Sequence, residues 1–190
     1  MFDGGVVAVA GSRSLPGRGA KLVAEVARDL VASGCSLVVG CCRGADAAAF
    51  CAVPVARVRV LCAFGAEGEG TGASSAVARV HAFAANGGAV EWWAGGGIAV
   101  PLSARLARRT QAVVSRASSG LVLFPSSSAS RGSWLAARLA VARRLPVLAF
   151  PLGFSPSLLP PLGAGRWERA SGSGVFARGW RWVGGQREMI

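Results

Sequence analysis

The chain has 190 residues, enough for one domain with a sizeable core, and its hydrophobic fraction of 52% excludes disorder as the global state. Twenty-one basic against nine acidic residues give a net charge of +12. This balance favours polyanionic partners such as nucleic acid, with charge for solubility alone as the alternative.

The cysteines and the termini bear on where the protein works. Five cysteines form an odd set without a CxxC pair, which indicates neither a disulfide framework nor a zinc site. The N-terminus has no basic segment ahead of its brief apolar run, unlike a secretory signal. The longest uncharged stretch, residues 145–165, contains five prolines that would break a membrane-spanning helix. We expect a cytoplasmic protein without a membrane segment.

Short apolar runs alternate with helical patterns along most of the chain. The predicted strands cover residues 5–10, 36–40, 57–64, 121–124 and 146–150, and the predicted helices cover residues 19–33, 45–53, 74–85, 102–118 and 133–144. Fully apolar runs suit parallel strands that are covered on both faces, and the strand–helix alternation implies crossover connections. The sequence therefore predicts an α/β fold: a three-layer Rossmann-like domain with a mostly parallel sheet of about five or more strands and helices on both faces.

Composition divides the chain into two parts. Residues 1–151 form the predicted nucleotide-binding domain, with residues 65–100 as an irregular Gly-rich insertion. Residues 152–190, rich in Pro, Gly and Trp, are expected to be a C-terminal tail or a small hairpin packed on the domain, with the hairpin around residues 175–183. The tail tryptophans, interleaved with arginines, form either a surface for base stacking or the apolar face of that hairpin.

Three apolar runs each stop at a short turn of Gly, Ser and Arg, and a helical pattern follows. The turns are Gly11-Ser12-Arg13, residues 40–46 and residues 125–133. A helix N-terminus leaves backbone N–H groups unpaired and carries partial positive charge, so a glycine-lined turn before it can wrap an anion. An arginine adds a planar donor fork. The turns therefore predict a phosphorylated ligand in the crevice at the carboxyl ends of the strands.

Together the turns resemble the Rossmann-like superfamily, often called SLOG, that joins DNA-processing protein A with the "lonely guy" nucleotide phosphoribohydrolases. The resemblance covers roughly residues 5–151. The matching segments are Gly11-Ser12-Arg13, the Gly-x-x-x-Gly-x-Asp pattern from Gly40 to Asp46, the helix with Arg108-Arg109, the strand Leu121 to Phe124 and the turn at Gly132-Ser133. The order and spacing of these motifs carry the resemblance.

The resemblance implies that Arg13 and the adjacent backbone hold a phosphate. Gly40 and Gly44 would allow the backbone to approach the ligand. Asp46 either stabilises its own turn or helix, or accepts from a ribose hydroxyl; Arg108 or Arg109 either reaches the crevice or is solvated. The expected ligand-binding set is Gly11, Ser12, Arg13, Gly40, Arg43, Gly44, Asp46, Arg108, Arg109, Ser128, Arg131, Gly132 and Ser133.

Departures from the superfamily patterns argue against a hydrolase. The phosphoribohydrolases carry a glutamate in the third motif that assists cleavage of the glycosidic bond, and Ala136 stands at that position here. The branch of DNA-processing protein A, which binds single-stranded DNA, has Arg-Asn-Arg where this chain has Arg108-Arg109-Thr110, and a serine-rich third turn like this one. We predict no catalytic residue, no metal site and no cofactor besides a possible nucleotide ligand.

Three functions follow from these features. The first is binding of a nucleotide or nucleotide-derived ligand for sensing or regulation, without hydrolysis. The second is binding of single-stranded DNA across the same arginines. The third is a nucleotide phosphoribohydrolase with a non-standard acid, for which Glu91 and Glu67 are the candidates in the sequence. Members of the superfamily commonly pair through helices, so a homo-oligomer is also open.

Overall fold

Apolar runs form the parallel strands of one sheet in the computed structural model, which describes residues 2, 4–171 and 173–185. Within these residues, eight strands pair in the order β4-β3-β2-β1-β5-β6-β8-β7. The parallel ones are β1 (Val6–Gly11), β2 (Ser36–Gly40), β3 (Val58–Leu61), β4 (Ala89–Glu91), β5 (Gly120–Phe124) and β6 (Val147–Ala149). The central strand β5 is buried along its whole length, as its apolar sequence predicts.

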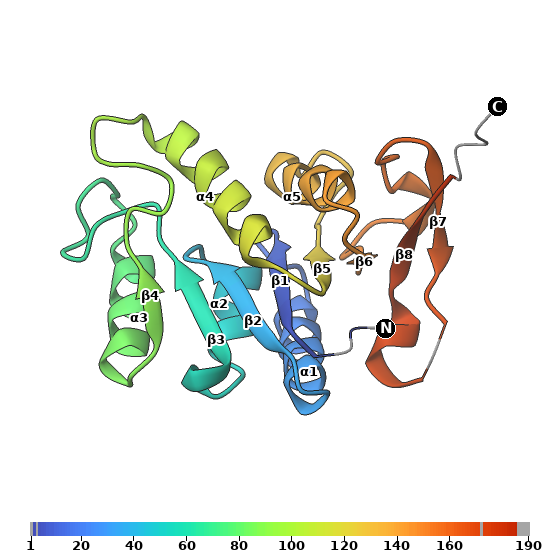
Figure 1. Cartoon of the computed structure of the whole chain (residues 1–190), viewed down its shortest axis with the longest axis horizontal. Helices are drawn as coiled ribbons and strands as arrows, with labels where there is room; N and C mark the ends of the chain where they lie inside the picture. Colours follow the sequence, from blue (N-terminus) through green and yellow to red (C-terminus); the bar gives the residue numbers. More distant parts are fainter. Residues whose placement is uncertain (1, 3, 172, 186–190) are drawn as a thin grey trace.

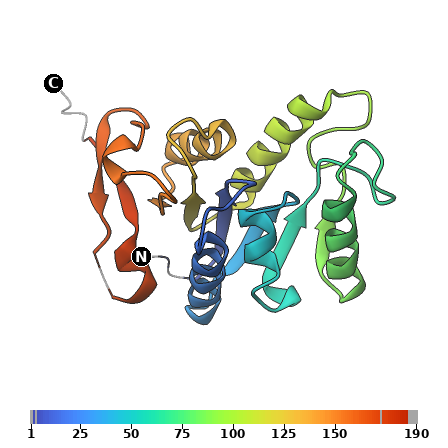
Figure 2. The same ribbon diagram turned by 180° about the vertical axis from the view of Figure 1, so that it is seen from behind.

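Helices cover both faces of the sheet, so the predicted three-layer Rossmann-like fold is confirmed (Figures 1 and 2). On one face lie α1 (Gly19–Ala32), α2 (Ala45–Phe50) and α3 (Ser74–Ala85). On the other face lie α4 (Leu102–Arg116) and α5 (Arg131–Ala142). Each face buries its own core: Val23 and Leu30 of α1 belong to the first, and Trp134 and Ala137 of α5 belong to the second. Short 3-10 helices occupy Val55–Arg57, Pro156–Leu158 and Gly174–Arg178.

Residues 65–100 are more regular than their composition suggests. The helix expected at residues 74–85 is confirmed as α3. The expectation of an irregular insertion is wrong at β4, which pairs parallel with β3 and extends the sheet. This strand has three residues, and Ala89 is exposed while Glu91 is charged, so no apolar run marks it. Backbone pairing with β3 therefore forms a strand that the hydrophobic pattern of the sequence does not predict.

The C-terminal residues form a hairpin that continues the sheet. Its strands are β7 (Gly165–Arg169) and β8 (Trp180–Gly184), and β8 pairs antiparallel with β6. The first strand thus starts before the region predicted from the sequence. Trp167 packs edge-on against Trp134 of α5 and against Trp182, with ring centroids 6.4 Å and 5.4 Å away. These tryptophans form the apolar face of the hairpin, and the interpretation as a base-stacking surface is not supported.

Candidate functional site

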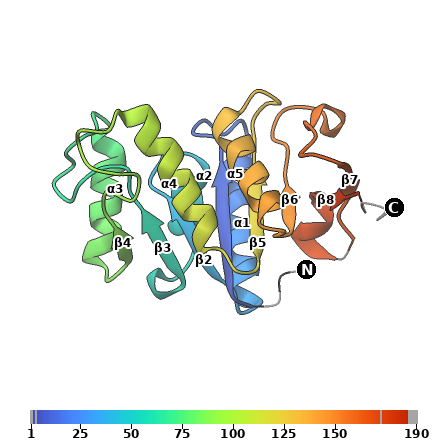
Figure 3. The same ribbon diagram turned by 45° about the horizontal axis from the view of Figure 1, so that its top comes forward.

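The three turns that the sequence singled out meet at one edge of the sheet. They follow β1, β2 and β5, whose parallel course brings their carboxyl ends together (Figures 1 and 3). Ser12 connects them: its N–H donates to the Phe124 carbonyl at 2.9 Å, and its carbonyl accepts from the Ala45 N–H at 3.0 Å. The Ser126 hydroxyl donates to the Ser12 hydroxyl at 2.8 Å. The turns form one hydrogen-bonded unit.

The glycines of these turns leave space that other residues of the protein occupy. A Cβ at Gly40 would lie 1.3 Å from Nη1 of Arg109, and a Cβ at Gly44 would lie 2.2 Å from the Ser12 carbonyl oxygen. Gly44 also has φ +79°, in the region that favours glycine. The close approach expected between a ligand and these glycines is taken instead by Arg109 and by the first turn. Ligand contact by Gly40 and Gly44 stays a prediction.

Asp46 and Arg109 form a buried ion pair behind the turns. Asp46 is 5% exposed and Arg109 is 7% exposed, and Oδ2 of Asp46 lies 3.1 Å from Nη1 of Arg109. The same oxygen accepts from the Cys42 N–H at 3.1 Å, which confirms Asp46 as a stabiliser of its own turn. Nη2 of Arg109 donates to the Cys42 sulfur at 3.1 Å. A buried cation held by one carboxylate and one weak acceptor fixes the helix α4 against the second turn.

The pKa values in this cluster follow from burial and charge. Burial raises the pKa of Asp46, and the positive charge of Arg109 opposes that rise. Burial lowers the pKa of Arg109, but Asp46, Cys42 and Cys41 together outweigh burial and raise that pKa above its ordinary value. The pKa of Cys42 is raised, first by its hydrogen bond with Cys41 and then by burial, so the thiol is neutral and a poor nucleophile.

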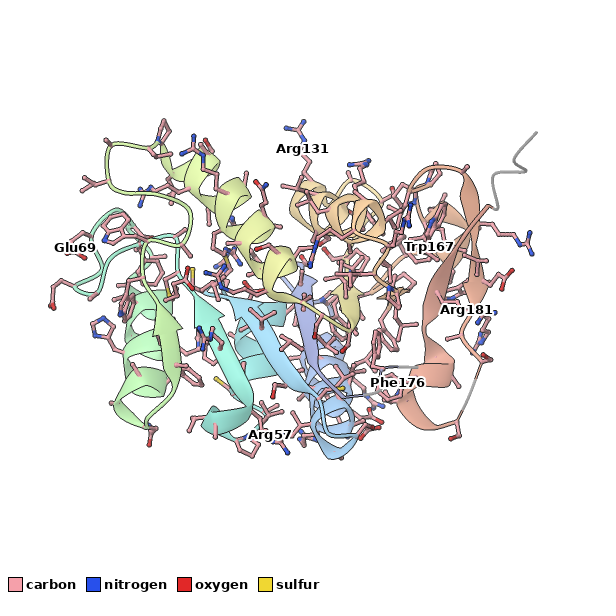
Figure 4. The ribbon with its side chains drawn as sticks, viewed as in Figure 1. Arg57, Glu69, Arg131, Trp167, Phe176 and Arg181 are labelled. Atoms are coloured by element: carbon pink, nitrogen blue, oxygen red, sulfur yellow. The ribbon has the colours of Figure 1, made fainter. Side chains whose placement is uncertain are left out.

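The remaining predicted arginines differ from Arg109 in exposure. Arg13, Arg43, Arg108 and Arg131 are exposed. Within the described part of the chain, no carboxylate pairs with any of these four. Arg131, at the start of α5, projects outward at the carboxyl-end side of the molecule (Figure 4). Ser128 is exposed, and Ser133 is buried in the first turn of α5 at 4% exposure.

Two cavities open at this edge. The first, of about 440 Å³, lies between α4 and α5, and six of the predicted residues line it: Gly11, Arg13, Asp46, Arg109, Arg131 and Gly132. The second, of about 410 Å³, is lined by Arg13, Arg43, Phe64, Leu102 and residues 71–76. Arg13, Cys42 and Leu106 line both cavities, so the two adjoin. We call the joined cavities the groove.

Several predicted residues do not line the groove. They are Ser12, Gly40, Gly44, Arg108, Ser128 and Ser133. Sequence reasoning missed the second cavity's wall at residues 71–76 and its apolar floor at Phe64, because a Gly-rich segment carries no phosphate or catalytic motif. A larger cavity of about 720 Å³ is lined by residues of the paired strands β6 and β8, with Arg144 among its other lining residues. Since none of the three turns reaches it, we place the candidate site at the groove.

The groove offers little for catalysis by its own residues. Asp46 is the one carboxylate among the described residues that line the two cavities, and Arg109 already engages it. Glu91, considered as a non-standard acid, pairs with Arg116 at 2.5 Å and lies outside this lining. Ala136 is fully buried in α5. Within the described residues, no group of three or more His, Cys, Asp or Glu side chains is placed to hold a metal ion.

Comparisons with known proteins place the fold. No protein-family model matches the sequence, and no curated protein matches it. The structure of DNA-processing protein A from Helicobacter pylori, whose single-stranded DNA binding mode has been described, matches with a TM-score of 0.62 and 20% identity over 79% of this chain. That from Streptococcus pneumoniae matches with a TM-score of 0.61 and 22% identity over 82% of this chain.

The chain has the Rossmann-like fold of DNA-processing protein A. It spans 66% of the H. pylori chain and 53% of the S. pneumoniae chain, so both are longer than the matched region. The resemblance drawn from the three turns is thereby confirmed at the level of the fold. A separate structural result is that no helix in the described residues is long and apolar enough to span a membrane.

Proposed function

We propose that the groove binds single-stranded nucleic acid. The observation that carries this proposal is the row of exposed arginines, Arg43, Arg13 and Arg131, along the two adjoining cavities, where none of them forms an ion pair with a described carboxylate. Phosphates along a strand repeat, so a basic groove with more than one recess suits a strand better than a single phosphate. The fold likeness to a protein that binds single-stranded DNA supports the same choice.

Each part of the groove has a chemistry that suits one part of a strand. Arg13 stands where the cavities join, in reach of a backbone phosphate on either side. The N-cap residue of α5, Ser130, makes no side-chain capping hydrogen bond, so a phosphate beside Arg131 meets uncapped helix N–H groups. Phe64 and Leu102 give the second cavity an apolar lining that suits an unstacked base. A duplex keeps its bases stacked and presents none to such a recess.

Fluorescence anisotropy with a labelled thymidine oligonucleotide of about 20 nucleotides tests the proposal. If the three arginines each neutralise one phosphate, the slope of log affinity against log salt is about −2, a roughly 20-fold loss between 50 and 200 mM salt. A duplex of the same length should bind more weakly at each salt concentration. Absence of binding to the oligonucleotide, or equal binding to the duplex, would contradict the proposal.

A second candidate is binding of a single nucleotide for sensing or regulation. The observation that favours it is the volume of the first cavity, about 440 Å³, which lies in the range of small-molecule sites and ends at the α5 N-terminus. Calorimetry with mono-, di- and cyclic nucleotides separates the candidates. Saturable binding of one nucleotide that tolerates salt, without binding of the oligonucleotide, would favour this second function.

Both ligand classes occur in the cytoplasm, the compartment that the cysteine pattern predicts. Pairing of two copies through helices, which the superfamily resemblance implies, stays a prediction. Size-exclusion chromatography with light scattering tests it directly.

A further inference from the structure

Arg105 is a second buried arginine on α4, one turn before Arg109, and it is 4% exposed. Each of its guanidinium nitrogens donates to a backbone carbonyl. Nε donates to Val100 at 2.8 Å, Nη1 to Ala63 at 2.7 Å and Nη2 to Gly70 at 2.7 Å. In the described residues no carboxylate pairs with it. Its hydrogen-bond acceptors are backbone carbonyls, all of them in two loops, and these offset part of the cost of burying its charge.

The two loops are residues 62–73, after β3, and residues 92–101, after β4. Trp93 of the second loop lies under the Arg105 guanidinium, with Cζ 5.2 Å from the ring centroid. Trp93 has φ +54°, a conformation that a bulky residue holds only where its surroundings impose it. Gly70 lies so close that a Cβ there would be 2.3 Å from Nη1 of Arg105. Arg105 is therefore tightly enclosed by both loops.

One of these loops lines the second cavity of the groove, and the other leads into it. Residues 71–73 of the first loop form part of the cavity wall, and residues 92–101 lead into Leu102, which also lines the cavity. Arg105 itself is not among the residues that line either cavity. Its hydrogen bonds reach Ala63 and Gly70 in the first loop and Val100 in the second, so one side chain holds the cavity-lining loop against the loop that precedes Leu102.

We infer that Arg105 is a positioning residue for binding of the nucleic-acid strand: it ties residues 62–73, which form part of the wall of the second cavity, to residues 92–101, which lead into Leu102, without touching the nucleic acid. This inference rests on the proposed function. It predicts that loss of Arg105 changes the salt dependence of binding differently from loss of a phosphate contact. Loss of a contact such as Arg13 lowers the salt slope by about 0.7, whereas loss of a positioning residue lowers affinity at an unchanged slope.

Two variants of the whole chain test the inference by different routes. Arg105→Gln removes the charge and the three-donor fork, so the salt slope reports whether that charge meets a phosphate. Gly70→Ala keeps Arg105 but displaces its guanidinium and strains the loop backbone, where Gly70 has φ +83°, and it tests the inference if Arg105→Gln does not fold. Arg138→Gln, which removes one charge at an exposed position of α5, is the matched control. The readouts are oligonucleotide affinity at several salt concentrations and amide hydrogen exchange.

We expect Arg105→Gln and Gly70→Ala each to weaken oligonucleotide binding by about 5- to 10-fold with the wild-type salt slope, the size of one typical hydrogen bond. Exchange should accelerate in residues 62–73 and 92–101 and be unchanged in β1 and β5. Faster exchange with wild-type affinity would overturn the inference and leave the proposed function standing. A reduced salt slope would instead make Arg105 a phosphate contact. Absence of binding by the wild-type chain would remove the proposed function, and this inference with it.

Discussion

The groove and the C-terminal hairpin are both rich in arginine, yet their charges are used differently. In the hairpin, Arg166 and Arg181 share the Glu168 carboxylate at 2.8 Å and 3.0 Å, and Arg178 pairs with Glu25 at 3.3 Å. In the groove, the described residues include no carboxylate that pairs with Arg13 or Arg131. Arg131 and Arg181 lie in these two separate regions (Figure 4). A count of arginines does not locate an anion-binding surface. Arg57, Arg138 and Arg144 are also exposed and form no ion pair among the described residues, so it is the gathering of such arginines along two adjoining cavities that marks the groove.

A similar contrast exists within the groove. Arg105 and Arg109 are buried and hydrogen-bonded to the protein, except for Nε of Arg109, and the exposed arginines at the rim form no ion pair within the described residues. The two buried arginines hold α4 and the loops in place, and the exposed arginines at the rim are available to contact a ligand. Substitutions should therefore separate into those that lower stability and those that lower affinity.

The largest expected effect is on stability, from Asp46→Ala. Removal of this carboxylate leaves the Arg109 charge buried without a charged partner, which should lower the free energy of unfolding by about 3–5 kcal/mol. The melting temperature of a chain of this size should fall by roughly 6–20 °C. Urea and thermal unfolding measure both. Glu168→Gln, which removes the carboxylate of an exposed ion-pair cluster, is the comparison, and an equal loss in the two variants would contradict the contrast between buried and exposed pairs.

The next effect is on affinity, from Arg13→Ala. This residue lines both cavities and is exposed, so we expect oligonucleotide affinity to fall about 10-fold and the salt slope to decrease by about 0.7. The melting temperature should stay at the wild-type value, because Arg13 makes no ion pair in the described residues. A loss of stability in step with affinity would show that Arg13 is structural.

The smallest effect concerns the hairpin at acid pH. The hydrogen bond from Arg181 lowers the pKa of Glu168 below its ordinary value of 4.5. A carboxylate with a lowered folded-state pKa stabilises the fold above its unfolded-state pKa, and that contribution is lost as the pH falls through the lower value. Below about pH 4.5 the unfolding free energy of the wild-type chain should therefore approach that of Glu168→Gln. A constant difference between the two down to pH 2 would refute the assignment.

The strands with apolar runs and the three turns could be predicted from the sequence, because buried strands and glycine-rich turns both produce patterns within a few neighbouring residues. The sequence did not predict β4, whose pairing is decided by its neighbour β3. It also left Arg108 and Arg109 undecided. Arg105, Arg109 and Val113 recur every four residues on one face of α4 and are all buried, so the helical period contained the signal for Arg109. An arginine on that face nevertheless resembles a solvated one until its carbonyl partners are known, which is why Arg105 was missed.

The most direct test of the account compares two double variants that remove the same charge. The first variant combines Arg13→Ala with Arg131→Ala and removes two exposed arginines from the groove. The second combines Arg178→Ala with Arg181→Ala and removes two arginines that already form ion pairs with carboxylates. Anisotropy with the thymidine oligonucleotide at about 100 mM salt should show a loss of roughly 30- to 100-fold for the first, if each arginine supplies one charge-assisted contact, and less than about 2-fold for the second. Equal losses would mean that the net charge of the chain, and not the groove, binds the strand.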